Sequence, residues 1–266
     1  MKIGRVSLSS ENQEIYLDTY IADHVREFTR KAILVIPGGG YSRVCSDREG
    51  EPIAMAFMPY GYNAFVLHYT VDRSKSFPTQ VIEVAKAIKH IKDHAEEYDI
   101  DPNELYTVGF SAGGHLSASA GVFWKLDEVQ KAVDMPYGYN KPKGVMLIYP
   151  VISGEYHVGS FQNLWCTDTP TVEQLDASSV EKHVDADSSP AFIMHTANDQ
   201  VVAVQNALVL ANAYSVAKVP FELHIYPDAP HGSALANRIT ECGKPEWNNS
   251  AIAEWVRLAA NWAETL

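Results

Sequence analysis

A serine flanked by glycines follows an apolar run near the middle of the chain. Residues 109–113 read Gly-Phe-Ser-Ala-Gly, the apolar residues 105–108 precede them, and small residues continue to position 120. This pattern is typical of a sharp strand-to-helix turn that strains the backbone of its serine and exposes the hydroxyl. The glycines allow the neighbouring strand and helix to pass close to the turn. Ser111 is therefore the candidate nucleophile.

A serine hydroxyl is a poor nucleophile at pH 7 and needs a neighbouring base, usually a histidine that a carboxylate orients. Where the serine lies on such a turn, the acid and then the histidine follow later in the chain, each after a strand. Asp199 comes just after the apolar run 191–196, and His231 lies in a Pro-His-Gly sequence after the run 221–226. We predict that Asp199 orients His231 and that His231 is the base for Ser111.

Both assignments have alternatives. Aspartate is common at helix N-termini, so capping a helix from residue 201 is the other role for Asp199. Among the ten histidines, His195 within a predicted strand and His115 in the helix after the serine are expected to be structural. The competing carboxylates, which are less well placed, are Asp185, Asp187 and Asp228.

Three consecutive glycines follow the first buried run. Residues 37–41 read Pro-Gly-Gly-Gly-Tyr and come directly after the run 31–36. A glycine-rich loop in this place presents backbone N–H groups to a developing oxyanion, together with the residue after the nucleophile, here Ala112. A plain turn is the alternative. A phosphate-binding loop is disfavoured, because neither Gly-x-x-x-x-Gly-Lys-Ser/Thr nor Gly-x-Gly-x-x-Gly is present.

The elements that must position these residues alternate between strand and helix. Continuous apolar runs are typical of strands buried on both faces, and stripes of apolar residues at helical spacing indicate helices against the sheet. We predict one α/β domain over residues 1–266, with a mostly parallel central sheet, helices on both faces and an N-terminal antiparallel hairpin. The expected strands are 31–36, 64–69, 105–109, 144–149, 191–196 and 221–226, the hairpin is 5–8 with 14–20, and the expected helices are 51–58, 79–98, one after Ser111, one from Asp199 and 249–265.

Two stretches interrupt the alternation. Residues 121–143 and 151–190 are polar and rich in glycine, proline and aromatic residues. Long connections in compact domains are usually functional, and those after sheet strands lie where ligands bind. We expect small lid-like insertions there. Residues 156–165 contain aromatic side chains, and we predict that Trp165 contacts a sugar ring. Packing of these aromatics onto the sheet is the alternative.

Composition excludes several classes of function. The 266 residues include 21 Lys and Arg against 33 Asp and Glu, a formal net charge of −12. This balance disfavours nucleic-acid and anionic-membrane partners, which need basic surfaces. No stretch has the length of apolar sequence that a membrane span needs, and the N-terminus has no apolar signal region, so we expect a cytoplasmic protein. The three scattered cysteines, Cys45, Cys166 and Cys242, have neither metal-site nor disulfide spacing, and we expect no metal.

Residues 37–41, 109–116 and 230–232 together resemble the α/β-hydrolase superfamily, and within it the bacterial acetyl esterases of carbohydrate metabolism, including acetylxylan and feruloyl esterases. The resemblance extends from residue 31 to the final helix. It implies that Ser111, Asp199 and His231 are catalytic, that no cofactor is needed, and that Tyr41 lies near the substrate. Pro37 replaces the histidine of the His-Gly-Gly-Gly loop of hormone-sensitive-lipase-like esterases, which favours the carbohydrate-esterase branch. The implied oxyanion donors are Gly39, Gly40 and Ala112.

The resulting hypothesis is a serine esterase that removes short acyl groups, acetyl first, from small-molecule or oligosaccharide esters through an acyl-enzyme. Three alternatives stay open. An arylformamidase shares the loop and serine motifs, and a peptidase of the prolyl-oligopeptidase type shares the triad but normally has a preceding domain, for which there is no room here. A non-catalytic binding protein with a hydrolase fold is disfavoured because every catalytic residue is present. The sequence makes no prediction of the oligomeric state.

Overall fold

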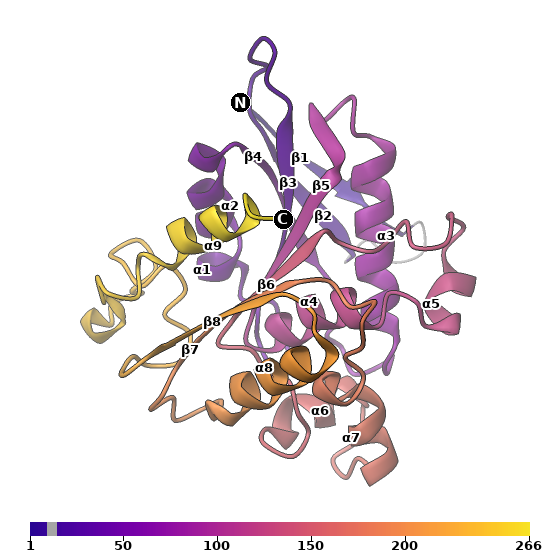
Figure 1. Cartoon of the computed structure of the whole chain (residues 1–266), viewed down its shortest axis with the longest axis vertical. Helices are drawn as coiled ribbons and strands as arrows, with labels where there is room; N and C mark the ends of the chain where they lie inside the picture. Colours follow the sequence, from indigo (N-terminus) through magenta and orange to yellow (C-terminus); the bar gives the residue numbers. More distant parts are fainter. Residues whose placement is uncertain (10–14) are drawn as a thin grey trace.

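One eight-stranded sheet runs through the computed structural model, which describes residues 1–9 and 15–266 (Figure 1). The strand order is β1-β2-β4-β3-β5-β6-β7-β8. Strands β1, β2 and β4 pair in antiparallel fashion, and every later pair is parallel. The strands are β1 (Lys2–Ser7), β2 (Tyr16–Ile21), β3 (Arg30–Ile36), β4 (Tyr62–His68), β5 (Ile100–Phe110), β6 (Gly144–Ile148), β7 (Ala191–Thr196) and β8 (Phe221–Tyr226).

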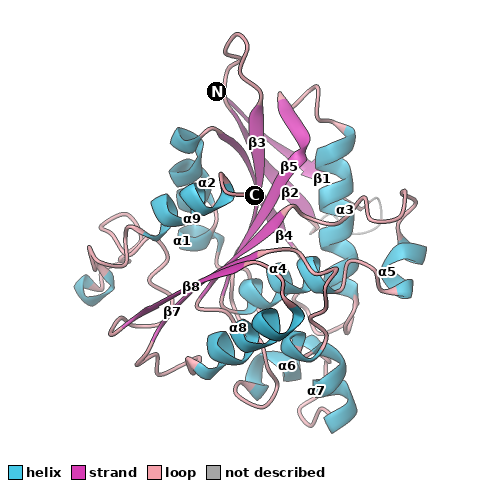
Figure 2. Ribbon diagram, viewed as in Figure 1, coloured by secondary structure: helices cyan, strands magenta, loops and turns pink. Residues whose placement is uncertain are grey.

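The predicted fold class is confirmed. The sheet is mostly parallel, the hairpin β1–β2 is antiparallel, and helices cover both faces (Figure 2). Glu14, which the prediction assigned to the hairpin, lies outside the described residues. The helices and short 3-10 turns are α1 (Ser46–Glu49), α2 (Glu51–Phe57), η1 (Met58–Tyr60), α3 (Thr79–Asp93), α4 (Ala112–Val122), α5 (Asp127–Ala132), α6 (Val158–Leu164), α7 (Val172–Ser178), η2 (Val180–Lys182), α8 (Gln205–Ala217), η3 (Pro245–Trp247) and α9 (Trp255–Ala263).

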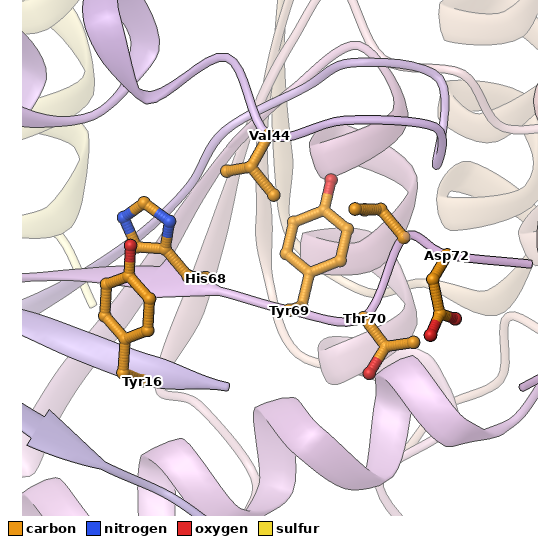
Figure 3. A pocket seen from close by; sticks show the side chains of 7 residues that line it. Tyr16, Val44, His68, Tyr69, Thr70 and Asp72 are labelled. Carbon is orange, nitrogen blue, oxygen red and sulfur yellow. The ribbon is translucent and has the colours of Figure 1, made fainter. Parts of the chain in front are cut away.

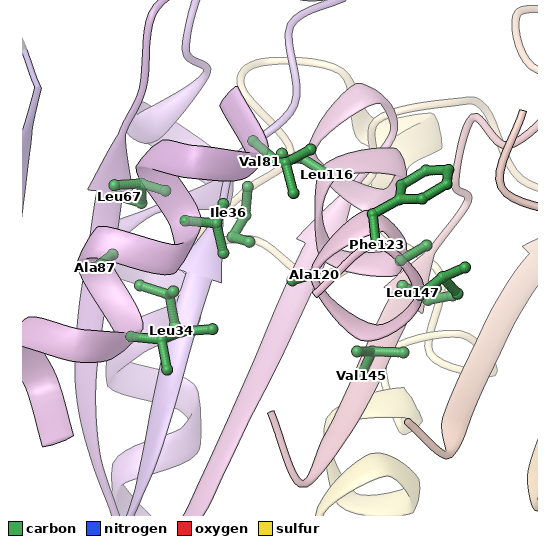
Figure 4. Close-up of a cluster of buried hydrophobic side chains, with 14 of the residues drawn as sticks. Leu34, Ile36, Leu67, Val81, Ala87, Leu116, Ala120, Phe123, Val145 and Leu147 are labelled. Carbon is green, nitrogen blue, oxygen red and sulfur yellow. The ribbon is translucent and has the colours of Figure 1, made fainter. Parts of the chain in front are cut away.

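The continuous apolar runs form strands because both faces of the sheet are covered. In β3, Leu34 and Ile36 pack toward α3, α4 and α8, whereas Ile33 and Val35 pack toward α2 and α9. All four side chains are fully buried. Figure 4 shows the first of these clusters, in which side chains of α3 and α4 meet those of the central strands. Such double coverage removes the alternation of apolar and polar residues that one-sided sheets show.

Three predicted helices are shorter than their apolar stripes indicated. The helix predicted over 79–98 ends at Asp93, because the ring of Tyr98 packs against Phe65 at 5.0 Å and the chain must turn back to reach it. The helix predicted from Asp199 begins only at Gln205, after a turn over residues 199–204. The last helix begins at Trp255 rather than at residue 249.

The two stretches expected to be insertions contain helices of their own. Residues 121–143 include the end of α4 and the whole of α5. Residues 151–190 include α6, α7 and η2. The second stretch packs near the carboxyl end of the parallel strands: Gly40, after β3, accepts a hydrogen bond from Asn163 of α6. Within the described parts of the chain, no helix is both long enough and apolar enough to cross a membrane.

Candidate active site

Ser111 occupies the turn between β5 and α4 in a backbone conformation that few side-chain-bearing residues adopt. Its φ and ψ are 53° and −119°. The turn is tight enough to require glycine on both sides. A Cβ on Gly109 would lie 2.1 Å from the Gly113 carbonyl oxygen, and one on Gly113 would lie 2.1 Å from the Ile36 carbonyl oxygen. Strain of this kind is characteristic of functional residues that the surrounding structure holds in place.

The side chains of Ser111, His231 and Asp199 form one hydrogen-bonded chain. His231 Nε2 lies 2.8 Å from Ser111 Oγ, and His231 Nδ1 lies 2.6 Å from Asp199 Oδ2. Each residue follows a different parallel strand, β5, β7 or β8, so their carboxyl ends bring the three together. Because the Asp199 carboxylate can only accept, Nδ1 carries the proton in neutral His231, and Nε2 is free to accept the proton of Ser111.

Two different oxygens of Asp199 perform two different tasks. Oδ1 accepts hydrogen bonds from the N–H groups of Val201 and Val202, both at 2.9 Å, and these close the turn that precedes α8. Oδ2 faces His231 and lies 3.5 Å from His195 Nε2. Burial acts to raise the pKa of Asp199, but the contacts with His195 and His231 outweigh it and hold that pKa well below its usual range. Asp199 is therefore ionised, and it does not cap α8 as the alternative assignment supposed.

The loop after β3 turns its carbonyl groups away from the site. The Gly38 carbonyl accepts from the Cys45 N–H, the Gly39 carbonyl from the Ser42 N–H, and the Gly40 carbonyl from Asn163 Nδ2. In a trans peptide the following N–H points opposite to the carbonyl, so the N–H groups of Gly39 and Gly40 point away from these contacts. No described residue accepts a hydrogen bond from either.

Ala112 completes the set of predicted donors. It is the first residue of α4, and its N–H therefore lacks an acceptor within the helix. Gly39 and Gly40 line a cavity of about 180 Å³ together with Ser111 and His231. Both glycines have positive φ, 128° and 66°, which explains why the loop needs them.

Sequence reasoning missed a buried acid beneath this loop. The Glu49 side chain accepts a hydrogen bond from the Gly38 N–H at 2.8 Å and another from the Tyr149 hydroxyl at 3.1 Å. The same hydroxyl accepts from the Ala234 N–H at 3.0 Å, and the Tyr149 ring meets the His231 ring edge to face at 4.8 Å. Burial raises the pKa of Glu49, which the charge of Arg48 partly opposes. Glu49 thus joins the glycine loop to the segment that contains His231.

Arg48 makes a second connection between these segments. Its Nε donates to the Gly232 carbonyl at 3.2 Å and lies 3.7 Å from Glu49 Oε1, while its guanidinium lies over the Trp247 ring. No local signal distinguishes Glu49 from the neighbouring acids Asp47 and Glu51, since its role depends on contacts with distant residues.

The two residues predicted to bind substrate do not lie in the cavity at Ser111. The Tyr41 ring is 2% exposed, and its hydroxyl is 2.7 Å from His115 Nδ1, so the prediction for Tyr41 is wrong. Trp165 donates its Nε1–H to Ser178 Oγ at 2.9 Å and packs against Phe77, and its contact with a sugar stays a prediction. The Tyr41 ring is structural, because it is buried and its hydroxyl has a protein partner.

His115 and His195 have the structural roles expected of them. His115 is fully buried between Tyr41 and the Ser178 carbonyl, and burial lowers its pKa to about 4. His195 is buried in β7 and its Nε2 donates to the Val202 carbonyl at 2.9 Å. Neither imidazole contacts Ser111.

A larger cavity, of about 450 Å³, lies near the segment that follows the glycine loop (Figure 3). Val44 lines it, whereas its neighbours Arg43 and Cys45 line the cavity at Ser111. Tyr69 in its wall donates its hydroxyl to the Pro37 carbonyl at 2.8 Å. This cavity is larger than the one at Ser111, but the hydrogen-bonded side chains that could perform chemistry line the cavity at Ser111. The cavity of about 450 Å³ is lined by Tyr16, Val44, His68, Tyr69, Thr70, Val71 and Asp72.

Comparison with known proteins places this geometry among esterases. Residues 17–214 match the family model described as BD-FAE. The chain is 39% identical over 221 residues to endo-1,4-beta-xylanase B of Butyrivibrio fibrisolvens, a match that covers 80% of this chain and 34% of that protein. It is 28% identical over 215 residues to an acetylxylan esterase of Xylanibacter ruminicola, covering 76% of this chain and 41% of that protein. The chain therefore spans less than half the length of these curated relatives.

A solved structure matches over nearly its full length. The crystal structure of an acetyl ester-xyloside bifunctional hydrolase from Caldicellulosiruptor lactoaceticus has a TM-score of 0.83 and 31% sequence identity. The match covers 98% of this chain and 96% of that chain.

Proposed function

The chain belongs to the BD-FAE family, as its resemblance to the carbohydrate esterases of the α/β-hydrolase superfamily predicted, and we propose that it is a serine carboxylesterase. It removes short acyl groups, acetyl first, from small-molecule or oligosaccharide esters. The observation that carries this proposal is the continuous hydrogen-bonded chain from Asp199 through His231 to Ser111, beside the Gly39 and Gly40 N–H groups, which have no acceptor among the described residues.

In the first half of the reaction, Ser111 Oγ attacks the ester carbonyl while His231 Nε2 takes its proton. The carbonyl oxygen becomes an oxyanion, and the N–H groups of Gly39, Gly40 and Ala112 donate hydrogen bonds to it. His231 then gives its proton to the alcohol oxygen, the ester C–O bond breaks, and the acyl group stays on Ser111. One such donor typically contributes about 3–4 kcal/mol to transition-state stabilisation.

In the second half, His231 takes a proton from a water molecule that attacks the acyl-enzyme. The same N–H groups hold the second oxyanion, and collapse of this intermediate returns the proton to Ser111 and releases the acid. Asp199 stays ionised throughout, because its low pKa keeps it a carboxylate at every pH at which His231 works as a base. It fixes the tautomer of His231 and stabilises the imidazolium.

Two observations support a short acyl group on a carbohydrate or similar alcohol. The cavity at Ser111 has a volume of about 180 Å³, below the roughly 300–1,000 Å³ of sites that enclose drug-sized ligands. Relatives are named for acetylxylan esterase and acetyl ester-xyloside hydrolase activities. A long acyl chain would extend beyond this cavity.

The test is a panel of 4-nitrophenyl esters of increasing acyl length, acetylated xylo-oligosaccharides and N-formylkynurenine. We expect kcat/KM to be highest for acetyl esters and to fall with acyl length, and Ser111→Ala to abolish turnover and labelling by a fluorophosphonate. Ser215→Ala, which removes an exposed serine on α8, is the matched control and should leave both unchanged. Faster turnover of N-formylkynurenine than of any acetyl ester would favour the arylformamidase alternative. Absence of both turnover and labelling would favour the binding protein.

A further inference from the structure

The cavity at Ser111 contains polar side chains that the proposed mechanism does not use. They are Arg43, His157 and Ser160, which line it together with Ser111 and His231. We propose that these three side chains bind a free hydroxyl next to the ester, so that the substrate is the ester of a polyhydroxylated alcohol such as a sugar. This inference rests on the proposed esterase function and names the half of the substrate that the three side chains recognise.

His157 is held in the tautomer that accepts a hydrogen bond. Its Nδ1 lies 3.2 Å from the Val201 carbonyl oxygen, which can only accept, so the proton is on Nδ1. Burial and the charge of His231 lower the pKa of His157 below its ordinary value, so the imidazole is neutral at pH 7. Nε2 consequently presents a lone pair, and no described residue donates to it. Its immediate neighbour is Gly159, whose Cβ, if present, would lie 4.0 Å away.

Ser160 and Arg43 are the donors of the set. Ser160 is buried, and its Oγ lies 3.9 Å from the position that a Cβ on Gly40 would take, directly beside the glycine loop. Arg43 is exposed, and its Cγ lies 2.9 Å from the corresponding position on Gly39, so its side chain extends over the same loop. Within the described chain, neither the Ser160 hydroxyl nor the Arg43 guanidinium has a hydrogen bond or ion pair with another side chain.

The chemistry of the ester decides which half of the substrate these groups meet. An acetyl group has a single polar atom, the carbonyl oxygen, and the loop N–H groups bind that atom. The alcohol half must therefore match the remaining polar wall. A hydroxyl donates one hydrogen bond and accepts others, which suits one acceptor at His157 and two donors at Ser160 and Arg43. Pockets of this kind use a few convergent polar groups to set orientation.

The arrangement also gives a function to the stretch 151–190. His157 and Ser160 both come from it, at and just inside the start of α6, and Asn163 of the same helix holds the Gly40 carbonyl. The inference thus adds polar side chains at the start of α6 to the sugar contact that was predicted within this stretch.

The experiment compares three acetates of one xyloside that differ at the carbon next to the ester. The first has a hydroxyl there, the second has hydrogen, and the third has fluorine, which is similar in size but cannot donate. We expect kcat/KM of the wild-type protein to be about tenfold higher for the hydroxyl compound than for the other two, as one hydrogen bond to a neutral acceptor implies. Fluorine makes the alcohol a better leaving group and by itself would raise kcat/KM of the fluoro compound. A lower kcat/KM for the fluoro compound than for the hydroxyl compound therefore cannot come from the leaving group.

Variants assign the preference to residues. His157→Leu should bring the ratio between the hydroxyl and fluoro compounds close to one, and His157→Gln, which keeps an acceptor, should retain part of it. His183→Leu is the matched control, since His183 belongs to the same stretch but does not line the cavity, and it should keep the full ratio. Ser160→Ala should lower the ratio between the hydroxyl and deoxy compounds.

A ratio of one in the wild-type protein would overturn the inference while leaving the esterase function intact. A ratio that His157→Leu leaves unchanged would overturn it as well. Failure of the wild-type protein to hydrolyse all three compounds and 4-nitrophenyl acetate would instead refute the proposed function on which the inference rests.

Discussion

Replacing Glu49 with glutamine tests whether the buried acid holds the glycine loop in its working position. The carboxylate accepts one hydrogen bond from the Gly38 N–H and one from the Tyr149 hydroxyl, and both contacts are buried. Glutamine has nearly the same shape but only one acceptor oxygen, so its NH₂ group must face one of the two donors. We expect the loop after β3 to shift away from Ser111 as a result.

The magnitude follows from these contacts. A hydrogen bond to a charged group contributes about 1.5–3 kcal/mol, and removal of a buried carboxylate relieves part of its desolvation, so Glu49→Gln should destabilise the fold by about 1–3 kcal/mol. For a chain of this size that is a fall in Tm of roughly 2–4 °C per kcal/mol. Loss of a whole oxyanion donor lowers kcat by about 10²–10³. Because Glu49 positions the donors and is not one of them, we expect kcat on 4-nitrophenyl acetate to fall about tenfold with KM within about threefold.

Glu83→Gln is the matched control. Glu83 is a second buried glutamate with two donors, the N–H and the hydroxyl of Thr70 at 2.8 and 2.6 Å, and burial raises its pKa as it does for Glu49. It does not line the cavity at Ser111. Both variants should lose comparable stability by thermal unfolding, and only Glu49→Gln should lose kcat. Equal losses of kcat in the two variants, or full kcat in Glu49→Gln, would refute the reasoning.

Four further outcomes are expected. Asp199→Asn should lower kcat about 10³–10⁴-fold, because His231 is then no longer held in one tautomer. The folded protein depresses the pKa of Asp199, so the stability that the carboxylate contributes is present above about pH 4 and is lost as the pH falls. The difference in the free energy of unfolding in urea between the wild-type protein and Asp199→Asn should therefore be larger at pH 7 than at pH 3. Gly113→Ala should prevent folding or lower Tm strongly, since its Cβ would meet the Ile36 carbonyl oxygen at 2.1 Å, whereas Gly159→Ala, with nothing nearer than 4.0 Å, should not. Tyr41→Phe should destabilise the protein by about 1–2 kcal/mol through loss of its buried hydrogen bond to His115, with KM for 4-nitrophenyl acetate unchanged, and a large rise in KM would restore Tyr41 to the substrate site. Finally, kcat/KM should fall as the solution is acidified, because Nε2 of His231 must be unprotonated to take the proton of Ser111, and a level profile down to about pH 4 would contradict a histidine base.

Order along the chain was sufficient to predict the strands and the three residues of the hydrogen-bonded chain. Two predicted strands, 191–196 and 221–226, agree with β7 and β8 to the residue. Asp199 and His231 were identified because each follows one of these strands, and parallel strands bring their carboxyl ends to one edge of the sheet. The position of Ser111 on its turn follows from the spacing of Gly109 and Gly113, which the close approach to other backbone atoms requires.

Contacts between distant segments were beyond reach of the sequence. The role of Glu49 depends on Gly38 and on Tyr149, a hundred residues away, and nothing in its local sequence indicates either contact. Tyr41 was assigned to the substrate through the family resemblance, and Trp165 through the aromatic side chains of residues 156–165. Each side chain has a protein partner, His115 or Ser178, that the sequence does not reveal, and burial removes Tyr41 from the cavity.

Helix boundaries failed for a related reason. The apolar stripe of α3 continues past Asp93, but the chain leaves the helix so that Tyr98 can pack on Phe65. Asp199 was expected to begin a helix because aspartate favours helix N-termini, yet its Oδ1 closes a separate turn and α8 begins at Gln205. In both places tertiary packing overrides the local preference.

The most direct test of the account is to trap the acyl-enzyme. 4-Nitrophenyl acetate is mixed with the protein, the reaction is stopped by acid within the first turnover, and the digested protein is examined by mass spectrometry. The account predicts one acetyl group, on the peptide that contains Ser111, with none in the Ser111→Ala variant. Turnover of the ester without any acetylated peptide, or acetylation of a different residue at the rate of turnover, would contradict it.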